Sequence, residues 1–225
     1  MISVVVPVYN EEHTISELHE RLVKTLAACC DSYEIVFVND GSTDNTEKTA
    51  LTLKPLELIS FAKNQGQTPA LNAGIRKAKG DIIVFLDADL QNNPEDIPKL
   101  LEKISQGCGA VVGRREHRQD PAARTIFSKV ANFIARLLLG VKVHDFGCGL
   151  KAYRAEFIKN FELWGQVQVF LPAIAKARGA KVCEVGVAHN DRKAGVSKIK
   201  ISNMVKGGLG LLKIAFIARF LNPYR

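Results

Sequence analysis

The most informative stretch of this sequence is Gly80-Asp81-Ile82-Ile83-Val84-Phe85-Leu86-Asp87-Ala88-Asp89-Leu90-Gln91. Its five apolar residues, Ile82 to Leu86, show no polar alternation, which is typical of a strand buried on both faces in a parallel sheet covered by helices. The run ends abruptly in two carboxylates, Asp87 and Asp89. Ligands of open α/β sheets bind just beyond the carboxyl ends of the strands. The stretch therefore predicts a ligand site at the end of a central strand.

The spacing of the polar residues indicates what kind of ligand binds there. Asp87 and Asp89 stand two residues apart, and the amide oxygen of Gln91 follows two residues later. Oxygen donors of this kind suit a hard divalent cation that bridges phosphates. The alternative is a solvated loop in which the two Asp residues cap the next helix. Further polar clusters follow the other predicted strands, and they favour the ligand site.

Strand and helix patterns alternate along the chain. Strands are predicted at 2–7, 33–38, 56–61, 82–86, 110–113, 145–153 and 180–187, and helical periods at 15–26, 70–79, 94–104 and 124–138. This alternation is the signature of βαβ units in a mainly parallel sheet. No repeat or low-complexity linker interrupts it, so we expect one α/β domain over residues 1–198, followed by a segment at 199–225.

Composition limits the class of protein. The 225 residues are 47% hydrophobic and 24% charged, as in ordinary globular proteins. No run of 18 uncharged apolar residues is present, and the first strand begins without a basic leader, which predicts a cytoplasmic protein without a transmembrane helix. The five cysteines show no CxxC spacing and no obvious pairing, so we expect reduced thiols rather than disulfides or metal ligands: Cys29, Cys30, Cys108, Cys148 and Cys183.

The net charge of +8 is concentrated near the C-terminus. Residues 189–225 hold eight Lys or Arg and one Asp, whereas 1–188 hold 23 basic and 22 acidic residues. This predicts an anionic partner near that end: phosphate, nucleic acid or lipid headgroups. The segment 199–225 is apolar but too charged to span a bilayer, so it is interpreted either as a helix on a membrane surface or as a helix packed on the domain.

The residues after the predicted strands fit a nucleoside diphosphate held through Mg²⁺ or Mn²⁺. Asp40 and Glu11 can accept hydrogen bonds from a base and a ribose, and the two Asp residues after the central strand can hold the cation. Several cations can neutralise the phosphates: Arg115, Arg124, Arg192 and Lys198. The chain lacks GxxxxGK[ST] and a GxGxxG after its first strand, which argues against ATP hydrolysis and dinucleotide redox chemistry.

Several motifs resemble those of inverting family 2 glycosyltransferases of GT-A fold. These are Pro7-Val8-Tyr9-Asn10-Glu11-Glu12, Val38-Asn39-Asp40-Gly41-Ser42, Asn64-Gln65-Gly66 and Asp87-Ala88-Asp89-Leu90-Gln91. Three further patterns resemble the polyprenyl-phosphate branch, which includes dolichol-phosphate mannose synthases: Arg124-xxx-Ser128-Lys129-xx-Asn132, Asp145-xx-Cys148-Gly149 and Arg192-xx-Gly195-x-Ser197-Lys198. The resemblance implies a Rossmann-like three-layer sandwich with a mainly parallel central sheet. It covers nearly the whole chain in the same order.

The resemblance also implies a role for individual residues. Donor binding would fall to Pro7, Tyr9, Glu11, Val38, Asp40, Asp87, Ala88 and Lys198. The cation would be coordinated by Asp87, Asp89 and Gln91, and the groups closest to the reaction would be Asp89, Arg115 and Arg124. The acceptor phosphate would meet Ser128 and Arg192. For single residues a simpler interpretation remains: Tyr9 can simply pack, and Arg124 can be a solvated charge on a helix.

The implied activity is inverting transfer of a hexose, mannose or glucose, from a GDP- or UDP-linked donor to a polyprenyl or dolichyl phosphate. The acceptor is mostly a dianion at pH 7, because the second pKa of a phosphate monoester is about 6, so no dedicated base is required. A lipid acceptor implies work at the cytoplasmic face of a membrane.

One segment departs from the pattern of this branch. Where such proteins tend to carry Gly-Glu-x-His-Arg-Phe-x-Pro, this chain has Gly165-Gln166-Val167-Gln168-Val169-Phe170-Leu171-Pro172. We expect the change to alter specificity rather than to abolish catalysis. Two rival functions stay open: a family 2 enzyme with a sugar or protein acceptor, for which Asp145 is the candidate base, and a non-catalytic module that binds nucleotide sugar or lipid phosphate. No motif supports nucleic-acid binding.

Overall fold

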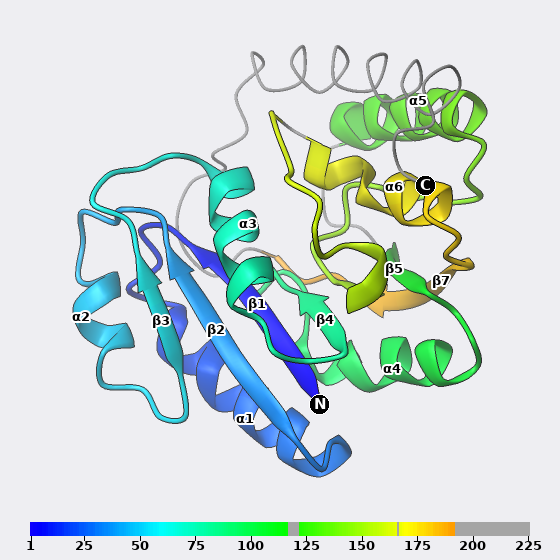
Figure 1. The fold of residues 1–225 in the computed structure, drawn as a ribbon. Helices are drawn as coiled ribbons and strands as arrows, with labels where there is room; N and C mark the ends of the chain where they lie inside the picture. The colour runs from blue at the N-terminus through cyan, green and yellow to red at the C-terminus, as the bar shows by residue number, and fades with distance from the viewer. Residues whose placement is uncertain (117–121, 166, 192–225) are drawn as a thin grey trace.

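The computed structural model describes residues 1–116, 122–165 and 167–191, with the backbone alone for 122–127. Within these ranges a seven-stranded sheet lies between two layers of helices (Figure 1). The predicted α/β three-layer architecture is therefore confirmed. The strands are β1 (Ile2–Val8), β2 (Tyr33–Asn39), β3 (Glu57–Ser60), β4 (Ile82–Phe85), β5 (Ala110–Glu116), β6 (Lys151–Arg154) and β7 (Val182–Ala188).

The strand order places most strand ends at one edge. The order is β3-β2-β1-β4-β6-β5-β7. β6 is antiparallel to both of its neighbours, and the other pairs are parallel. Six strands therefore share one direction, and their carboxyl ends lie at the same edge as the start of β6. This edge collects the polar clusters that the sequence places after the strands.

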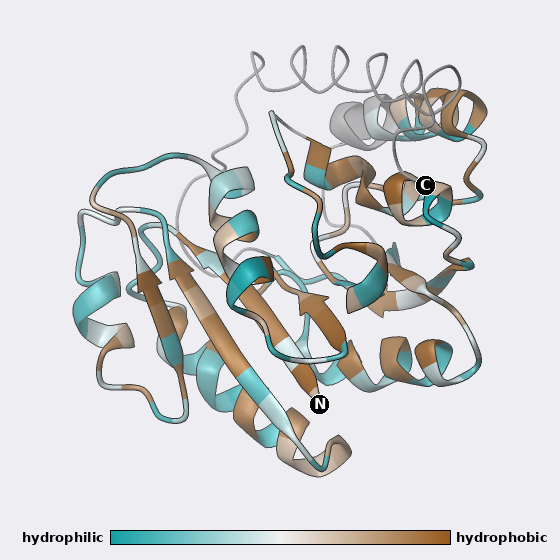
Figure 2. Cartoon of the chain, in the orientation of Figure 1, coloured by the Kyte–Doolittle hydropathy of each residue, from teal (hydrophilic) through white to brown (hydrophobic). Residues whose placement is uncertain are grey.

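Two apolar cores, one on each face of the sheet, hold the layers together. Alternate residues of a strand point to opposite faces, so Val4 and Val6 of β1 belong to one core and Val5 to the other. Helices α1 (Ile15–Cys29) and α4 (Ile97–Ser105) cover the first core, with α2 (Thr46–Ala50) beside them. Helices α3 (Gln67–Lys77), α5 (Ala122–Leu139) and α6 (Leu171–Ala177) cover the second. Figure 2 shows the strands as hydrophobic bands between these layers.

Three short 3₁₀ turns complete the described elements: η1 (Pro94–Asp96), η2 (Ala155–Phe157) and η3 (Val167–Phe170). Element bounds differ from the sequence prediction in two places that matter for the site. The predicted strand at 145–153 is a loop up to Leu150, and β5 continues past Gly113 to Glu116 because it pairs with β7 along its whole length. As a result Arg115 belongs to a strand.

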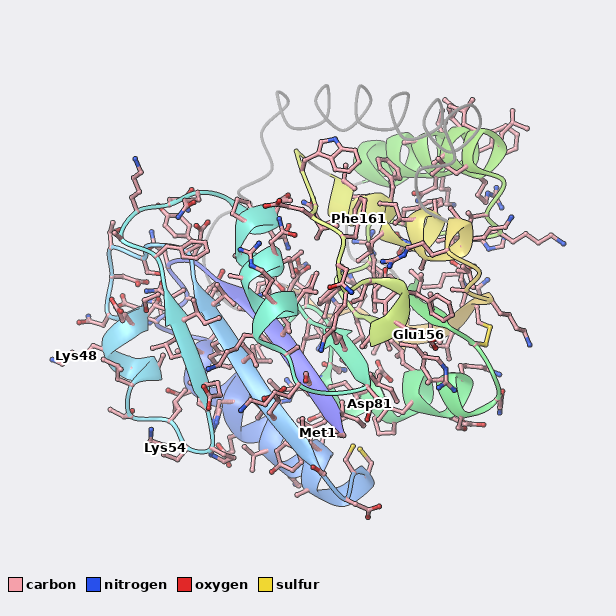
Figure 3. All side chains as sticks on the ribbon, in the orientation of Figure 1. Met1, Lys48, Lys54, Asp81, Glu156 and Phe161 are labelled. Atoms are coloured by element: carbon pink, nitrogen blue, oxygen red, sulfur yellow. A yellow bond between two sulfur atoms is a disulfide. The ribbon has the colours of Figure 1, made fainter. Side chains whose placement is uncertain are left out.

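The prediction that all five cysteines are reduced was wrong. Cys108 and Cys183 form a disulfide across 75 residues of sequence, and a yellow bond marks a disulfide beside β7 in Figure 3. Cys108 precedes β5 and Cys183 lies in β7, so the parallel pairing of these strands brings the two sulfurs together. Spacing in the sequence could not reveal the pair, because the contact depends on strand register. The free cysteines of the described residues are Cys29, Cys30 and Cys148.

None of the described helices combines the length and the apolar character needed to cross a bilayer. The proposed domain boundary at 198 and the segment 199–225 lie outside the described residues.

Candidate active site

The turn after β4 places two carboxylates at the carboxyl edge of the sheet. Asp89 is buried, with its Oδ1 accepting the backbone N–H of Gln91 at 3.1 Å. Asp87 is half-buried, and its Oδ1 accepts a hydrogen bond from Gln67 Nε2 at 3.0 Å. Leu90, which lies between Asp89 and Gln91, has a φ of 59°, in the left-handed region that non-glycine residues seldom adopt. Backbone strain of this kind concentrates at functional sites.

Gly149 brings the loop before β6 against this turn. A Cβ atom at position 149 would lie 2.0 Å from Asp87 Oδ2, so any larger residue would displace the carboxylate. The loop at 145–150 therefore packs directly against the turn at 87–91. This close approach explains why the Cys148-Gly149 motif requires a glycine at its second position.

A cavity of about 80 Å³ opens beside Asp87. It lies between the ends of β1 and β4, the start of α3, the loop before β6 and the turn η3. Its lining residues are Pro7, Gln67, Leu71, Phe85, Leu86, Asp87, Phe146, Gly147, Cys148, Gly149, Lys151, Gln168 and Val169. Of the residues predicted for donor binding, the structure brings Pro7 and Asp87 together here.

Lys151 is a buried cation in the wall of this cavity, and the sequence analysis gave it no role. Its Nζ donates to the carbonyl oxygen of Phe146 at 2.9 Å and, at longer range, to those of Val169 at 3.4 Å and Gln168 at 3.5 Å. Burial lowers the pKa of Lys151 to about 8. The side chain thus joins the loop before β6 to η3 across the cavity.

The loops after β1 and β2 are joined by side-chain contacts to backbone groups. Asn10 N–H donates to Ser42 Oγ, Thr43 N–H to Asn10 Oδ1, and Glu11 N–H to Thr46 Oγ1, all within 3.0 Å. Glu11 also accepts a hydrogen bond from Thr14 Oγ1 through its Oε2 at 3.0 Å. These hydrogen bonds hold the loops after β1 and β2 together, so their polar groups line this edge of the sheet.

Asp40 organises the loop after β3. Its carboxylate is buried and accepts the backbone N–H groups of Gln65 and Gly66, at 2.7 and 2.8 Å, and the side-chain amide of Asn64 at 3.0 Å. The motif Asn64-Gln65-Gly66 is thus held by the aspartate of the second motif. Both carboxylate oxygens of Asp40 therefore accept hydrogen bonds from this loop.

Two predicted donor-binding side chains lie in the core. The side chain of Val38 is fully buried in the core under α3, because the alternation along β2 turns Val36 and Val38 to the same core. The predicted role of Val38 at the nucleoside stays a prediction. Ala88 is 5% exposed and packs in the opposite core. Tyr9 is half-buried just beyond β1.

Arg115 and Asp145 form a buried ion pair. Arg115 Nε and Nη2 donate to the two carboxylate oxygens of Asp145, at 2.7 and 2.8 Å, and the side chains are 11% and 6% exposed. This bidentate geometry fixes both groups. A fixed guanidinium suits a phosphate contact, whereas a carboxylate held in this way is a poor general base.

The remaining predicted cations lie mostly outside the described side chains. Arg124 belongs to the first turns of α5, where the backbone alone is described, and Arg192 and Lys198 fall outside the described residues. Ser128, predicted to meet the acceptor phosphate, is half-buried on α5 and accepts a hydrogen bond from Asn132 Nδ2 at 3.4 Å.

The end of β7 reaches the carboxylate turn, which the sequence analysis did not anticipate. Asn190 N–H donates to the carbonyl oxygen of Gln91 at 2.9 Å, and Asn92 pairs with His189 in a β-bridge. The described part of the chain ends at Asp191, one residue after this contact. Only the sheet order, in which β7 follows β5 at the edge, could have revealed the contact.

Cys148 is a buried thiol beside this contact. Burial raises its pKa to about 12, and its Sγ donates to Asn92 Oδ1 at 3.5 Å. It is therefore protonated at neutral pH and is neither a nucleophile nor a thiolate ligand.

The segment that departs from the family pattern lines the cavity. Gln168 is buried, and its Oε1 accepts a hydrogen bond from Thr68 Oγ1 at 2.7 Å. Thr68 Oγ1 also lies 2.6 Å from the carbonyl oxygen of Gly165. The segment is thus anchored to the first turn of α3, beside the residue that contacts Asp87.

The oxygen donors of this edge fit a cation that takes few protein ligands. Across the described ranges, no three His, Cys, Asp or Glu side chains gather as a group that could hold a metal ion. Mg²⁺ is commonly bound by one or two carboxylates together with substrate phosphates and waters. Asp87 and Asp89, with the Gln91 amide, match that smaller requirement.

Comparison with known proteins gives consistent results. A family model described as Glycosyl transferase family 2 matches residues 3–161. Dodecaprenyl-phosphate galacturonate synthase of Rhizobium johnstonii is 37% identical over 97% of this chain and 68% of its own length. Undecaprenyl-phosphate 4-deoxy-4-formamido-L-arabinose transferase of Shewanella sediminis is 37% identical over 91% of this chain and 63% of its own length. The chain thus spans about two thirds of the length of these relatives.

Among solved structures, glucosyl-3-phosphoglycerate synthase of Mycobacterium tuberculosis in complex with Mn²⁺, uridine diphosphate and phosphoglyceric acid superposes with a TM-score of 0.72 at 21% identity. The match covers 97% of this chain and 78% of that protein. The same enzyme in complex with Mg²⁺ and uridine diphosphate gives 0.70 at 20% identity, over 97% of this chain and 79% of that protein. At this level of identity the likeness shows the fold, which confirms the expected GT-A type.

Proposed function

This chain belongs to glycosyl transferase family 2, and on that premise we propose that it transfers a sugar from a nucleoside diphosphate donor to a polyprenyl phosphate with inversion at the anomeric carbon. The observation that carries most weight is the position of Asp87 at a cavity on the carboxyl edge of the sheet. Relatives with 37% identity, named for transfer to dodecaprenyl and undecaprenyl phosphate, support the acceptor class.

The nucleophile in this reaction needs no protein base. A polyprenyl phosphate is mostly dianionic at pH 7 because its second pKa is about 6. The difficult part is the departure of the nucleoside diphosphate, on which negative charge develops. A divalent cation held by Asp87, Asp89 and Gln91 would neutralise that charge.

The protein's own cations complete the site. Arg115 is oriented by Asp145 and would contact a phosphate, assisted by Arg124 and Lys198. Ser128 and Arg192 would hold the acceptor phosphate. Tyr9, Glu11 and the loop fixed by Asp40 would form the nucleoside side of the site.

An enzyme that glycosylates a sugar or protein hydroxyl would need a base near the acceptor. The sequence offered Asp145 for that role. Its two oxygens are engaged by Arg115 in a buried ion pair, and this arrangement disfavours the alternative.

The candidate donors differ in their sugar and in their nucleotide. Mannose or glucose, linked to GDP or UDP, follows from the resemblance of the sequence. The names of the relatives add galacturonate and 4-deoxy-4-formamido-L-arabinose. Because the acceptor is a membrane lipid, we place the reaction at a membrane surface, with the nucleotide sugar arriving from the cytoplasm.

The test is a donor panel read by product mass. The full chain is incubated with polyprenyl phosphate, Mg²⁺ or Mn²⁺ and, one at a time, GDP-mannose and the UDP-linked forms of glucose, galactose, galacturonate and 4-deoxy-4-formamido-L-arabinose. We expect one donor to give a polyprenyl-phosphate sugar with release of its nucleoside diphosphate. Nucleotide binding without any product from the panel would support the non-catalytic alternative and contradict the proposal.

A further inference from the structure

The cavity beside Asp87 has a cation in its wall that the proposed function leaves unused. Among the described residues that line this cavity, Lys151 is the only one with a positive charge, and it is 6% exposed. Its Nζ donates to three neutral carbonyl oxygens, those of Phe146 at 2.9 Å, Val169 at 3.4 Å and Gln168 at 3.5 Å. The last two distances are near the upper limit for a hydrogen bond. The ammonium group is therefore held by one good contact and two weak ones.

No carboxylate forms an ion pair with this ammonium group. The ion pairs among the described residues do not include Lys151. Asp87 and Asp145 act on it only from a longer distance. Asp145 is engaged by Arg115, and Asp87 is a proposed ligand of the divalent cation. Buried charges normally have a partner, because desolvation without one is costly. Lys151 is thus a buried cation that a negative group of a ligand can pair with.

The covalent structure of a nucleotide sugar indicates which of its parts reaches this cavity. The sugar is bonded directly to the second phosphate of the donor. The cation proposed at Asp87 and Asp89 would hold the diphosphate, so the sugar must lie next to these two residues. The cavity opens beside Asp87, and its wall combines apolar side chains with a few polar groups, as small-molecule sites do. We therefore expect the sugar to occupy it.

We propose that Lys151 selects a donor whose sugar is a uronate, and that the uronate carboxylate pairs with the buried ammonium group. This rests on the proposed function for the presence of a nucleotide sugar. A uronate differs from the corresponding hexose by a carboxylate in place of the hydroxymethyl group. The carboxylate would form a charge-assisted hydrogen bond with Lys151, whereas the hydroxymethyl group can accept only a weaker one.

The diphosphate is the other anionic part of the donor, and it fits Lys151 less well. Its charge already has proposed partners in this site, namely the divalent cation and the guanidinium of Arg115. A carboxylate on the sugar has no other positive partner among the described residues that line the cavity. The observations therefore favour the sugar as the source of the negative group, and the experiment separates the two sources.

The test measures binding of matched donors to the full chain by isothermal titration calorimetry with Mg²⁺. UDP and GDP alone first establish which nucleotide binds. The matched pairs are UDP-glucuronate with UDP-glucose, UDP-galacturonate with UDP-galactose, and GDP-mannuronate with GDP-mannose. We expect wild type to bind the uronate about tenfold or more tightly than the hexose in at least one pair. Equal or weaker binding of the uronate in every pair would overturn the proposal, and this comparison needs no variant.

A variant tests whether Lys151 is the residue responsible. Lys151→Met removes the charge and keeps a long side chain, so it should bind the nucleoside diphosphate like wild type and lose the preference for the uronate. Lys181→Met, which removes an exposed lysine, is the control and should keep that preference. Far-UV circular dichroism verifies folding, and the wild-type comparison decides if Lys151→Met does not fold.

Two results with Lys151→Met would contradict the proposal. One is an unchanged preference for the uronate. The other is an equal loss of affinity for the nucleoside diphosphate alone and for the uronate donor, which would assign the charge of Lys151 to the diphosphate.

Binding and transfer together separate this proposal from the proposed function. If wild type prefers the uronate but forms no product with polyprenyl phosphate from any donor, the proposed function fails and the selectivity of the cavity stands. If wild type transfers a neutral hexose and binds the matched uronate no better, the proposed function stands and the role of Lys151 in selecting the sugar is refuted.

Discussion

At the scale of single residues, Lys151 is the unexpected component of the site. Its ammonium group is buried beside a cavity and is held by backbone carbonyls of Phe146, Gln168 and Val169. Desolvation of a cation is costly, and the lowered pKa of Lys151, about 8, records that cost. The residue links the loop that bears Gly149 to the turn that bears Gln168, so the shape of the cavity depends on it.

The lowered pKa of Lys151 makes a prediction about stability. The folded value of about 8 lies below the value of about 10.4 for an unfolded lysine. Between these values the unfolded chain binds a proton that the folded protein has released, so this group makes the free energy of unfolding rise with pH. The stability of wild type relative to Lys151→Met should therefore rise by about 2 kcal/mol from about pH 7 to about pH 9.5.

Urea denaturation of both proteins at the two pH values measures this difference. Lys181→Met, which removes an exposed lysine, is the control and should track wild type at both pH values. A constant difference between wild type and Lys151→Met would mean that the lysine is not desolvated in the folded protein.

The sequence predicted some of these residues for physical reasons and missed others. Asp87 and Asp89 directly follow an uninterrupted apolar run. Such a run is typical of a central strand of a parallel sheet, so the position of the two residues at its carboxyl end could be predicted. Lys151 could not be predicted, because a lysine at the start of a strand is usually solvated. The alternation along β2 explains why the side chain of Val38 points into the core, and the predicted role of this residue at the nucleoside stays a prediction.

At the scale of elements, the disulfide ties the edge of the sheet together. Cys183 lies in β7, the edge strand, and Cys108 precedes β5, which is its only neighbour in the described sheet. β7 leads directly to the contact between Asn190 and Gln91. The covalent link therefore supports the strand that carries the chain to the carboxylate turn.

Reduction of this disulfide should destabilise the protein. Opening a link across 75 residues restores conformational freedom to the unfolded chain, and we expect the free energy of unfolding to fall by about 2 to 4 kcal/mol. The measurement is urea denaturation of wild type and of Cys108→Ala with Cys183→Ala, each with and without reductant. Cys29→Ser is the control, since Cys29 is exposed and free. An unchanged midpoint for wild type in reductant would contradict the expectation.

Elements with a strong hydrophobic period were predicted well, and segments governed by pairing were not. The predicted strands 33–38 and 82–86 agree with β2 and β4 within one residue at each end. The loop before β6 is part of the predicted strand 145–153, yet in the structure Gly149 approaches Asp87 closely there. The length of β5 depends on β7, a partner that is distant in the sequence.

At the scale of the whole molecule, the sheet order explains why residues so far apart form one site. The alternation of strands and helices predicted a mainly parallel sheet, but no local pattern specified that β6 would run in the opposite direction between β4 and β5. That reversal brings the start of β6, with Lys151 and the preceding glycine loop, to the edge where the other strands end. The site therefore depends on the order and direction of the strands as well as on the sequence motifs.

The proposed function requires the carboxylate turn at this edge for sugar transfer to polyprenyl phosphate. The control for it lies at the opposite edge: Asp81 precedes β4 and pairs with the N-terminal amine of Met1. Figure 3 labels both residues. Asp81→Asn removes a carboxylate from the same stretch of sequence without touching the proposed site.

The most direct measurement is the rate of polyprenyl-phosphate sugar formation, determined by product mass, for wild type, Asp89→Asn and Asp81→Asn. The donor is the one that reacts in the panel, with Mn²⁺ or with EDTA in excess. We expect Asp89→Asn and EDTA each to lower the rate by about 100-fold or more, and Asp81→Asn to react like wild type. Wild-type rates for Asp89→Asn in the presence of EDTA would contradict this expectation.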